Sequence, residues 1–145
     1  MAETLSQGMK RFNYLSSEID NTYHEIARRL NLSDSAMMIL YTICNFGDSC
    51  PLSDICRLSG VSKQTINSAI RKLEAEGVVF LESRQGRRKL VCLTERGKAL
   101  VANTVARLID KENEAFGAWT EEEQAVYLKL TERFLLQMKD KAKEL

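Results

Sequence analysis

The sequence has few of the residues on which most enzymes depend. Its 145 residues include one histidine, one proline and only 7% aromatic residues. It contains no P-loop, no dinucleotide-binding fingerprint and no nucleophile elbow. The single histidine, His24, leaves little general acid–base chemistry. We therefore expect a protein that is not an enzyme and that uses no metal or other cofactor.

Long hydrophobic runs are also missing. No stretch approaches the length of a membrane-spanning helix, and the opening residues Met1-Ala2-Glu3 have neither the basic nor the apolar region of a signal peptide. The length and the hydrophobic content of 44% are ordinary for one soluble domain. We expect a single domain over residues 1–145, located in the cytoplasm and without a membrane partner.

The four cysteines follow no spacing typical of a disulfide framework or a zinc site. Cys44, Cys56 and Cys92 fall in apolar patterns, which predicts that they are core residues. Cys50 directly precedes Pro51 at an expected helix N-terminus, where a thiolate would be stabilised. An inert thiol is the simpler interpretation of Cys50, and a redox-sensing role is the alternative.

Charge is distributed unevenly along a chain whose net charge is only +1. Residues 51–98 contain ten Lys and Arg against five Asp and Glu, whereas residues 1–50 and 99–145 each have a balance of −2. A basic central segment is the electrostatic pattern expected of a protein that contacts phosphates.

The basic segment begins with two short predicted helices. Pro51 suits the first position of a helix, and Gly60 marks a tight turn after it. Ser62 is a good N-cap for a second helix over Lys63–Glu76, which Gly77 ends. The apolar positions of the two helices are spaced by three and four. They are Leu52, Ile55 and Leu58, then Ile66, Ala69, Ile70 and Leu73.

The other face of the second helix carries polar side chains of types that can contact DNA. Gln and Asn can pair with adenine, Arg can pair with guanine, and Ser or Thr can contact phosphates or base edges. This face has no acidic residue before Glu74, whereas an ordinary solvated helix surface usually includes some. We interpret it as a recognition helix for the major groove. The candidate DNA-binding residues are Ser62, Lys63, Gln64, Thr65, Asn67, Ser68, Arg71 and Lys72.

A β-hairpin follows the second helix. Residues 78–81 and 90–93 are apolar and rich in strand-forming residues. The loop between them turns at Gly86 and carries four cations, Arg84, Arg87, Arg88 and Lys89. Such a loop could be a solubilising turn, but beside a helix-turn-helix it is better interpreted as a DNA-contacting wing.

The flanking segments predict long helices. One covers Leu5–Leu30 and a second Asp34–Phe46; after the hairpin, Thr94 caps a helix from Glu95 to Phe116, and Thr120 caps the last one. The last helix has apolar residues on more than one face. Residues 1–32 and 99–145 are therefore predicted to form a dimerisation layer around a DNA-binding part at 33–98, although they could simply cover it in a monomer.

These residues resemble the MarR family of bacterial transcriptional regulators. The family commonly has Asp-x-Arg in its wing, followed by Leu-Thr-x-x-Gly. Here Leu93-Thr94-Glu95-Arg96-Gly97 matches the second motif, Arg87 falls at the wing arginine, and Gln85 replaces the aspartate. The resemblance implies a mainly α fold with a small β-hairpin wing: a winged helix-turn-helix with N- and C-terminal dimerisation helices.

The resemblance also implies a function. It points to a homodimeric repressor of a palindromic double-stranded DNA operator, released by a small, often aromatic, effector. The side chains implied to line the effector cleft are Tyr14, Tyr23, His24, Met37, Met38 and Tyr41. Aromatic and Met residues at helical spacing are more often core residues. Two alternatives stay open: a redox-switched regulator acting through Cys50, and a winged-helix protein-interaction module that does not bind DNA.

Overall fold

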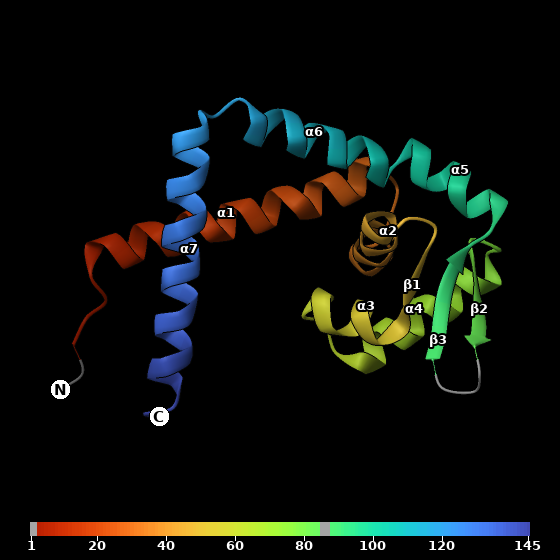
Figure 1. The fold of residues 1–145 in the computed structure, drawn as a ribbon, viewed down its shortest axis with the longest axis horizontal. Coiled ribbons are helices and arrows are strands. Elements are labelled where there is room, and N and C mark those ends of the chain that lie inside the picture. The colour runs from red at the N-terminus through yellow and green to blue at the C-terminus, as the bar shows by residue number, and fades with distance from the viewer. Residues whose placement is uncertain (1–2, 85–87) are drawn as a thin grey trace. The chain divides into compact units, whose positions relative to one another are not determined.

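The computed structural model describes residues 3–84 and 88–145, with the backbone alone for Arg84 and Arg88. The fold is mostly helical with one small antiparallel sheet, as predicted (Figure 1). The chain divides into two compact units, Met1–Leu108 and Ile109–Leu145. In chain order the elements are α1 (Gln7–Arg29), α2 (Asp34–Phe46), β1 (Ser49–Pro51), α3 (Leu52–Ser59), α4 (Lys63–Ala75), β2 (Val79–Arg84), β3 (Arg88–Leu93), α5 (Glu95–Asn103), α6 (Val105–Gly117) and α7 (Glu121–Ala142).

Serine side chains cap the first two helices. The Ser6 hydroxyl accepts a hydrogen bond from the Met9 amide (3.2 Å), and the Ser33 hydroxyl accepts one from the Ala36 amide (3.1 Å). Each bond satisfies an amide that the first turn of a helix leaves without a backbone partner. The bounds of α2 are those predicted, and α1 is shorter than predicted by a residue or two at each end.

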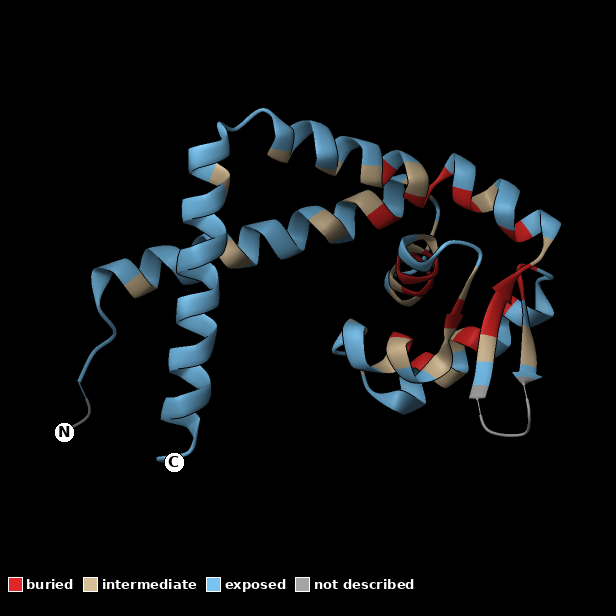
Figure 2. Cartoon of the chain, viewed as in Figure 1, coloured by how far each residue is buried: buried red, intermediate tan, exposed pale blue. Residues whose placement is uncertain are grey.

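Helix α2 supplies the centre of the core. Its Ile39, Leu40 and Ile43 are fully buried, as are Ile55 of α3 and Ile66 of α4. Figure 2 shows buried residues concentrated in α2 and in the elements around it. Because α3 and α4 both pack on α2, the two helices are held in a fixed relation to each other.

The sheet has the strand order β1-β3-β2. Strands β2 and β3 form the predicted hairpin, with Val79 opposite Leu93 and Ser83 opposite Lys89. Strand β1 was not predicted. Its three residues pair with β3, and they place Pro51 on an edge strand, where a missing N–H costs least. The prediction that Pro51 is the first residue of a helix was therefore wrong, because α3 begins at Leu52.

The hairpin is joined to α5 through Thr94. Its hydroxyl donates a hydrogen bond to the Gly77 carbonyl (2.6 Å) and accepts one from the Gly97 amide (2.9 Å). Its own amide donates to the Val78 carbonyl (3.0 Å). One residue therefore caps α5 as predicted and also ties the start of α5 to the turn after α4.

The helix predicted from Glu95 to Phe116 is interrupted. Thr104 has φ −129° and ψ −93°, so α5 ends at Asn103 and α6 starts at Val105. The Thr104 hydroxyl donates to the Leu100 carbonyl (2.6 Å). Threonine side chains that bond back to the preceding turn compete with the backbone ladder and often bend helices, which a hydrophobic pattern does not reveal.

The second unit contains the part of α6 from Ile109 onward, the turn after it and α7. Thr120 and Glu123 form a reciprocal capping box, with the Thr120 hydroxyl accepting from the Glu123 amide (3.1 Å) and the Glu123 carboxylate accepting from the Thr120 amide (2.9 Å). No residue of α7 is buried. Among the residues that the structure describes, no helix combines the length and the apolar character needed to cross a membrane.

Candidate nucleic-acid interface

Helices α3 and α4 are joined by a short, well-defined turn. Gly60 adopts φ +67°, the left-handed conformation that glycine adopts without strain. The Ser59 hydroxyl accepts a hydrogen bond from the Val61 amide (3.2 Å), which closes the turn. Ser62 then caps α4 as predicted, because its hydroxyl accepts from the Thr65 amide (3.2 Å). The two helices and this turn form a helix-turn-helix.

Helix α4 has one buried face and one exposed polar face. Ile66, Ile70 and Leu73 are buried, as their spacing predicted. The polar side chains predicted to contact DNA lie on the accessible part of the helix. Lys63, Gln64, Thr65, Ser68, Arg71 and Lys72 are exposed, and Asn67 is half-buried.

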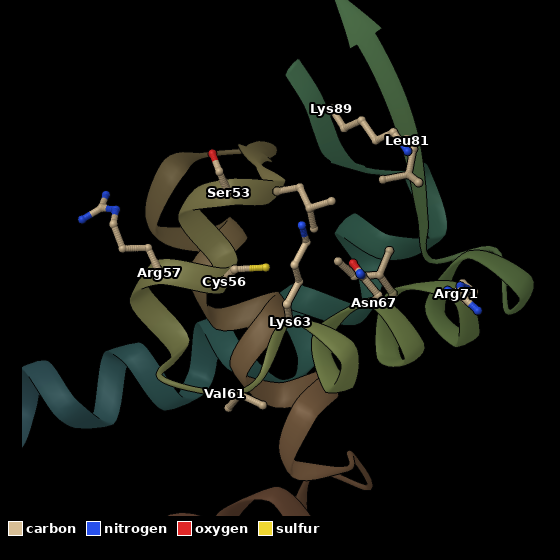
Figure 3. Close-up of a pocket in the computed structure, with 11 residues that line it drawn as sticks. Ser53, Cys56, Arg57, Val61, Lys63, Asn67, Arg71, Leu81 and Lys89 are labelled. Carbon is tan, nitrogen blue, oxygen red and sulfur yellow. The ribbon is translucent and has the colours of Figure 1, made fainter. Parts of the chain in front are cut away.

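A groove of about 920 Å³ lies between α3, α4 and the hairpin strands. Figure 3 shows residues of α3, α4 and the strands arranged around this hollow. Within the part of the chain that the structure describes, its lining includes apolar side chains, four cations and no acidic residue. The lining residues are Leu52, Ser53, Cys56, Arg57, Val61, Lys63, Asn67, Ile70, Arg71, Leu81 and Lys89. A groove with this lining suits a chain of phosphates.

The groove divides the predicted recognition residues into two sets. Lys63, Asn67 and Arg71 recur every four residues and line the groove. Gln64 and Ser68 form the next stripe around the helix and do not line it. These two sets can therefore contact different parts of one ligand.

Ser62 and Thr65 are coupled at the start of α4. The Ser62 hydroxyl donates to the Thr65 hydroxyl (2.8 Å), in addition to its capping bond. Both bonds orient Ser62 toward its own helix. The structure thus gives Ser62 a capping role, whereas the Thr65 hydroxyl accepts in this bond and can still donate one of its own.

The hairpin extends further than its sequence predicted. Strands β2 and β3 continue to Arg84 and Arg88, whose backbones are paired in register. Lys89 is exposed and lines the groove. The wing arginine Arg87 and its neighbours Gln85 and Gly86 lie outside the described residues.

Sequence analysis missed two residues of the groove, Ser53 and Arg57. They lie one turn apart on α3, and both are exposed. Arg57 donates a hydrogen bond from Nη2 to the carboxylate of Asp54 (3.0 Å). Two features of the sequence could have indicated Arg57 as a groove residue. It is the first cation of the basic segment, and it lies off the apolar stripe of its helix.

The proposed effector-cleft residues have varied surroundings. Met37 is buried, and Tyr23 and Tyr41 are half-buried against the core. Tyr14 is exposed and lies under Arg11, whose guanidinium carbon is 5.4 Å from the ring centroid. The imidazole Nδ1 of His24 is 3.0 Å from the Asp34 carboxylate, which connects α1 to α2. Met38 is half-buried.

Cys50 does not have the environment that its sequence position predicted. It is fully buried in β1 and precedes the helix by two residues. Burial, and secondly the negative charge of Asp54, raises the pKa of its thiol from 9.0 to about 11. The expectation of a favoured thiolate was therefore wrong, because desolvation outweighs the helix terminus. Cys92 is buried as predicted, whereas Cys44 and Cys56 are half-buried at the edge of the core.

No group of three or more His, Cys, Asp or Glu side chains within residues 3–84 and 88–145 is arranged to hold a metal ion. The chain has a helix-turn-helix formed by α3 and α4, a basic groove beside it, and the paired strands β2 and β3. These three features together define a winged helix-turn-helix protein.

Comparison with known proteins finds a family to which part of the chain is similar. The model of the MarR family matches residues 30–89, which include α2, α3, α4 and β2. No curated protein sequence matches the chain.

Solved structures of regulators have the same fold. The MarR-family regulator NMB1585 from Neisseria meningitidis has a TM-score of 0.77 at 19% identity, over 94% of this chain and 96% of that one. BpsR from Bordetella bronchiseptica, whose DNA binding is regulated by 6-hydroxynicotinic acid, has a TM-score of 0.64 at 20% identity, over 86% and 98%. NadR, solved with 4-hydroxyphenylacetate, has a TM-score of 0.67 at 17% identity, over 93% and 95%.

Proposed function

We propose that this protein is a homodimeric repressor that binds a palindromic double-stranded DNA operator. The observation that carries the proposal is the groove beside α4, whose described lining has four cations and no acidic residue. Next to it, α4 exposes amide and hydroxyl side chains of the kind that read base edges. In this proposal residues 33–98 form the DNA-binding part, and residues 1–32 and 99–145 form the dimerisation helices.

Exposed apolar side chains on the terminal helices support the dimer. Helix α1 exposes Phe12, Leu15 and Ile19. Helix α7 exposes a larger set, namely Val126, Tyr127, Leu128, Leu130, Phe134, Leu135, Leu136 and Met138. Soluble monomers seldom expose contiguous apolar surface on this scale, so a second copy of the chain is the partner that we propose for it.

The dimer determines the form of the operator. A two-fold dimer presents two copies of α4, which fit two half-sites about 10 base pairs apart. The wings, with their clustered Arg84, Arg87, Arg88 and Lys89, would follow the backbone toward the flanking minor grooves. A dimer bound in this way would repress by occupying the promoter.

A small aromatic acid is the proposed effector. BpsR and NadR are related in fold and are described with 6-hydroxynicotinic acid and 4-hydroxyphenylacetate, respectively. Among the candidate residues, Tyr14 and His24 are exposed, whereas Tyr23, Met38 and Tyr41 are half-buried. Met37 is buried, and Tyr23 and Tyr41 pack against the core. These three residues therefore serve primarily in core packing.

Selection from a random DNA library tests the proposal. We expect enrichment of a palindrome with half-sites about one helical turn apart. Binding without sequence preference would reduce the protein to a non-specific DNA binder. No binding to any duplex at low salt would favour the alternative of a winged-helix protein-interaction module.

A further inference from the structure

The groove beside α4 has a wall that the recognition helix and the wing do not provide. Helix α3 contributes Ser53 and Arg57 to its lining, and both side chains are exposed. Figure 3 shows them on α3, across the hollow from the strand residues Leu81 and Lys89. The cations of the groove thus come from three separate elements, which are α3, α4 and β3.

We propose that one sugar-phosphate strand of the DNA lies in this groove, that Arg57 contacts its phosphates, and that Asp54 positions Arg57 for that contact. This inference rests on the proposed DNA-binding function. A groove that takes a phosphate strand needs cations along its walls and no carboxylate in its lining, and the residues named above satisfy both conditions.

The Asp54–Arg57 pair has the geometry of a positioning device. The Asp54 side chain is only 26% exposed, whereas that of Arg57 is 69% exposed. Asp54 does not line the groove, and its carboxylate contacts the guanidinium through Nη2 alone among the described atoms. A guanidinium has five N–H donors, so the others stay available for a phosphate.

Stability accounts for this pair only in part. Asp54 lies in the first turn of α3, where a carboxylate is favourable to the helix dipole. Its ion pair with the largely exposed Arg57 adds little to folding, because solvent screens it and two side chains lose freedom. A carboxylate near DNA also repels phosphates. Its presence beside the groove is explained if it fixes the position of Arg57, because a guanidinium held in place loses less freedom on binding.

Salt-dependent binding of the full-length protein tests the contact. The probes are a mixed-sequence duplex and the selected operator, each titrated at several salt concentrations. Removing one phosphate contact should make the salt slope shallower by about 0.9 unit. We expect this change for Arg57→Ala on both duplexes, with binding weakened about fivefold at moderate salt. Arg57→Lys should retain the slope and part of the affinity.

The matched control is the Glu25–Arg29 pair on α1. It is also a carboxylate–arginine pair within one helix, with Nη2 at 3.2 Å from the carboxylate oxygen, and it does not line the groove. Arg29→Ala should leave affinity and slope unchanged. An equal loss for Arg29→Ala and Arg57→Ala would mean that net charge alone is responsible, and would overturn the proposal.

Asp54→Asn tests positioning. If Asp54 only repelled phosphates, the substitution would tighten DNA binding. We expect the opposite, about a twofold to threefold weakening in the wild-type background, and no such weakening when Arg57 is already alanine. Tighter binding in both backgrounds would refute the positioning role. If wild type binds DNA but Arg57→Ala does not change the slope, the inference fails while the proposed function stands.

Discussion

Thr94 connects three elements through its hydroxyl and its amide. It caps α5, donates to the carbonyl of Gly77 after α4 and pairs with the carbonyl of Val78 before β2. Gly97 lies in the first turn of α5, where the Val78 carbonyl comes so close that a Cβ at this position would overlap the oxygen. The Leu-Thr-x-x-Gly motif is therefore a structural device that sets the base of the wing relative to α5.

Gly97→Ala should destabilise the protein by about 1–3 kcal/mol, because a backbone carbonyl must shift to accept the methyl group. Denaturant unfolding measures the loss. The control is Gly8→Ala, at a helical position where the added carbon meets nothing within 4 Å beyond its own helix backbone and chain neighbours, and which should be neutral or slightly stabilising. Equal effects of the two substitutions would mean that the close approach at Gly97 is not a real constraint.

Burial of Cys50 predicts a pH dependence of stability. Its folded pKa of about 11 lies above the ordinary value of 9.0. The folded state therefore binds the thiol proton more tightly than the unfolded state does. The resulting stabilisation is complete below pH 9 and is lost as the pH rises through about 11.

Comparison of wild type with Cys50→Ala between pH 8 and 11 measures this contribution, and the difference in unfolding free energy should narrow as pH increases. Thiol labelling of native protein at neutral pH should also be slow at Cys50 and faster at the half-buried Cys56. Rapid labelling of Cys50 would contradict the burial and would restore the redox-switch hypothesis.

At the scale of elements, strong local signals were sufficient for most of the fold. The caps Ser62, Thr94 and Thr120 and the turn glycine Gly60 each placed a boundary correctly from sequence. Strand β1 escaped prediction because its three residues have no pattern of their own and pair only through β3. The break at Thr104 escaped because the apolar repeat continues through it, so that nothing in the pattern marks the change of backbone conformation.

The interface could be predicted only in part for the same reason. The polar face of α4 follows from periodicity, so its exposed side chains could be named from the sequence. Arg57 belongs to the groove because α3 packs beside α4 and the strands, and this tertiary fact leaves no periodic signal. The division of α4 into a groove set and an outer set likewise requires the neighbouring elements.

The two sets on α4 should respond differently to substitution. Gln64 lies outside the groove, so Gln64→Ala should cost about 1–3 kcal/mol on the operator and relax preference at one base position. Lys63 lines the groove, so Lys63→Ala should weaken binding on all sequences and make the salt slope shallower by about one unit. Selection with each variant, together with salt titration, separates the effects. A specificity change for Lys63→Ala with an unchanged slope would reverse the assignment.

At the scale of the whole molecule, charge and apolar surface lie on different segments. The cations concentrate in residues 51–98, whereas the exposed apolar side chains concentrate on α1 and α7. This separation is what a regulator needs if one part holds two copies together while the other meets DNA. Recognition of a palindrome depends on both, because a single α4 reads only one half-site.

Light scattering should therefore give a particle of twice the 16.5 kDa chain mass at micromolar concentration. Leu135 of α7 is 51% exposed, and we place it in the dimer contact. In a two-fold interface Leu135→Glu changes both copies of the chain. If each copy loses about 1.5–3 kcal/mol of dimerisation free energy, the dimer should weaken more than a hundredfold. The variant should retain its helical content, since the side chain is accessible in the single chain.

Gln137→Glu adds the same charge to the same helix at a polar position and should leave the dimer intact. Loss of the dimer in Leu135→Glu should also abolish tight binding to the palindrome and leave weak binding to a single half-site, because the second recognition helix no longer gains from being tethered. A wild-type particle of 16.5 kDa, or a monomeric variant that still binds the palindrome with full affinity, would contradict the dimeric arrangement.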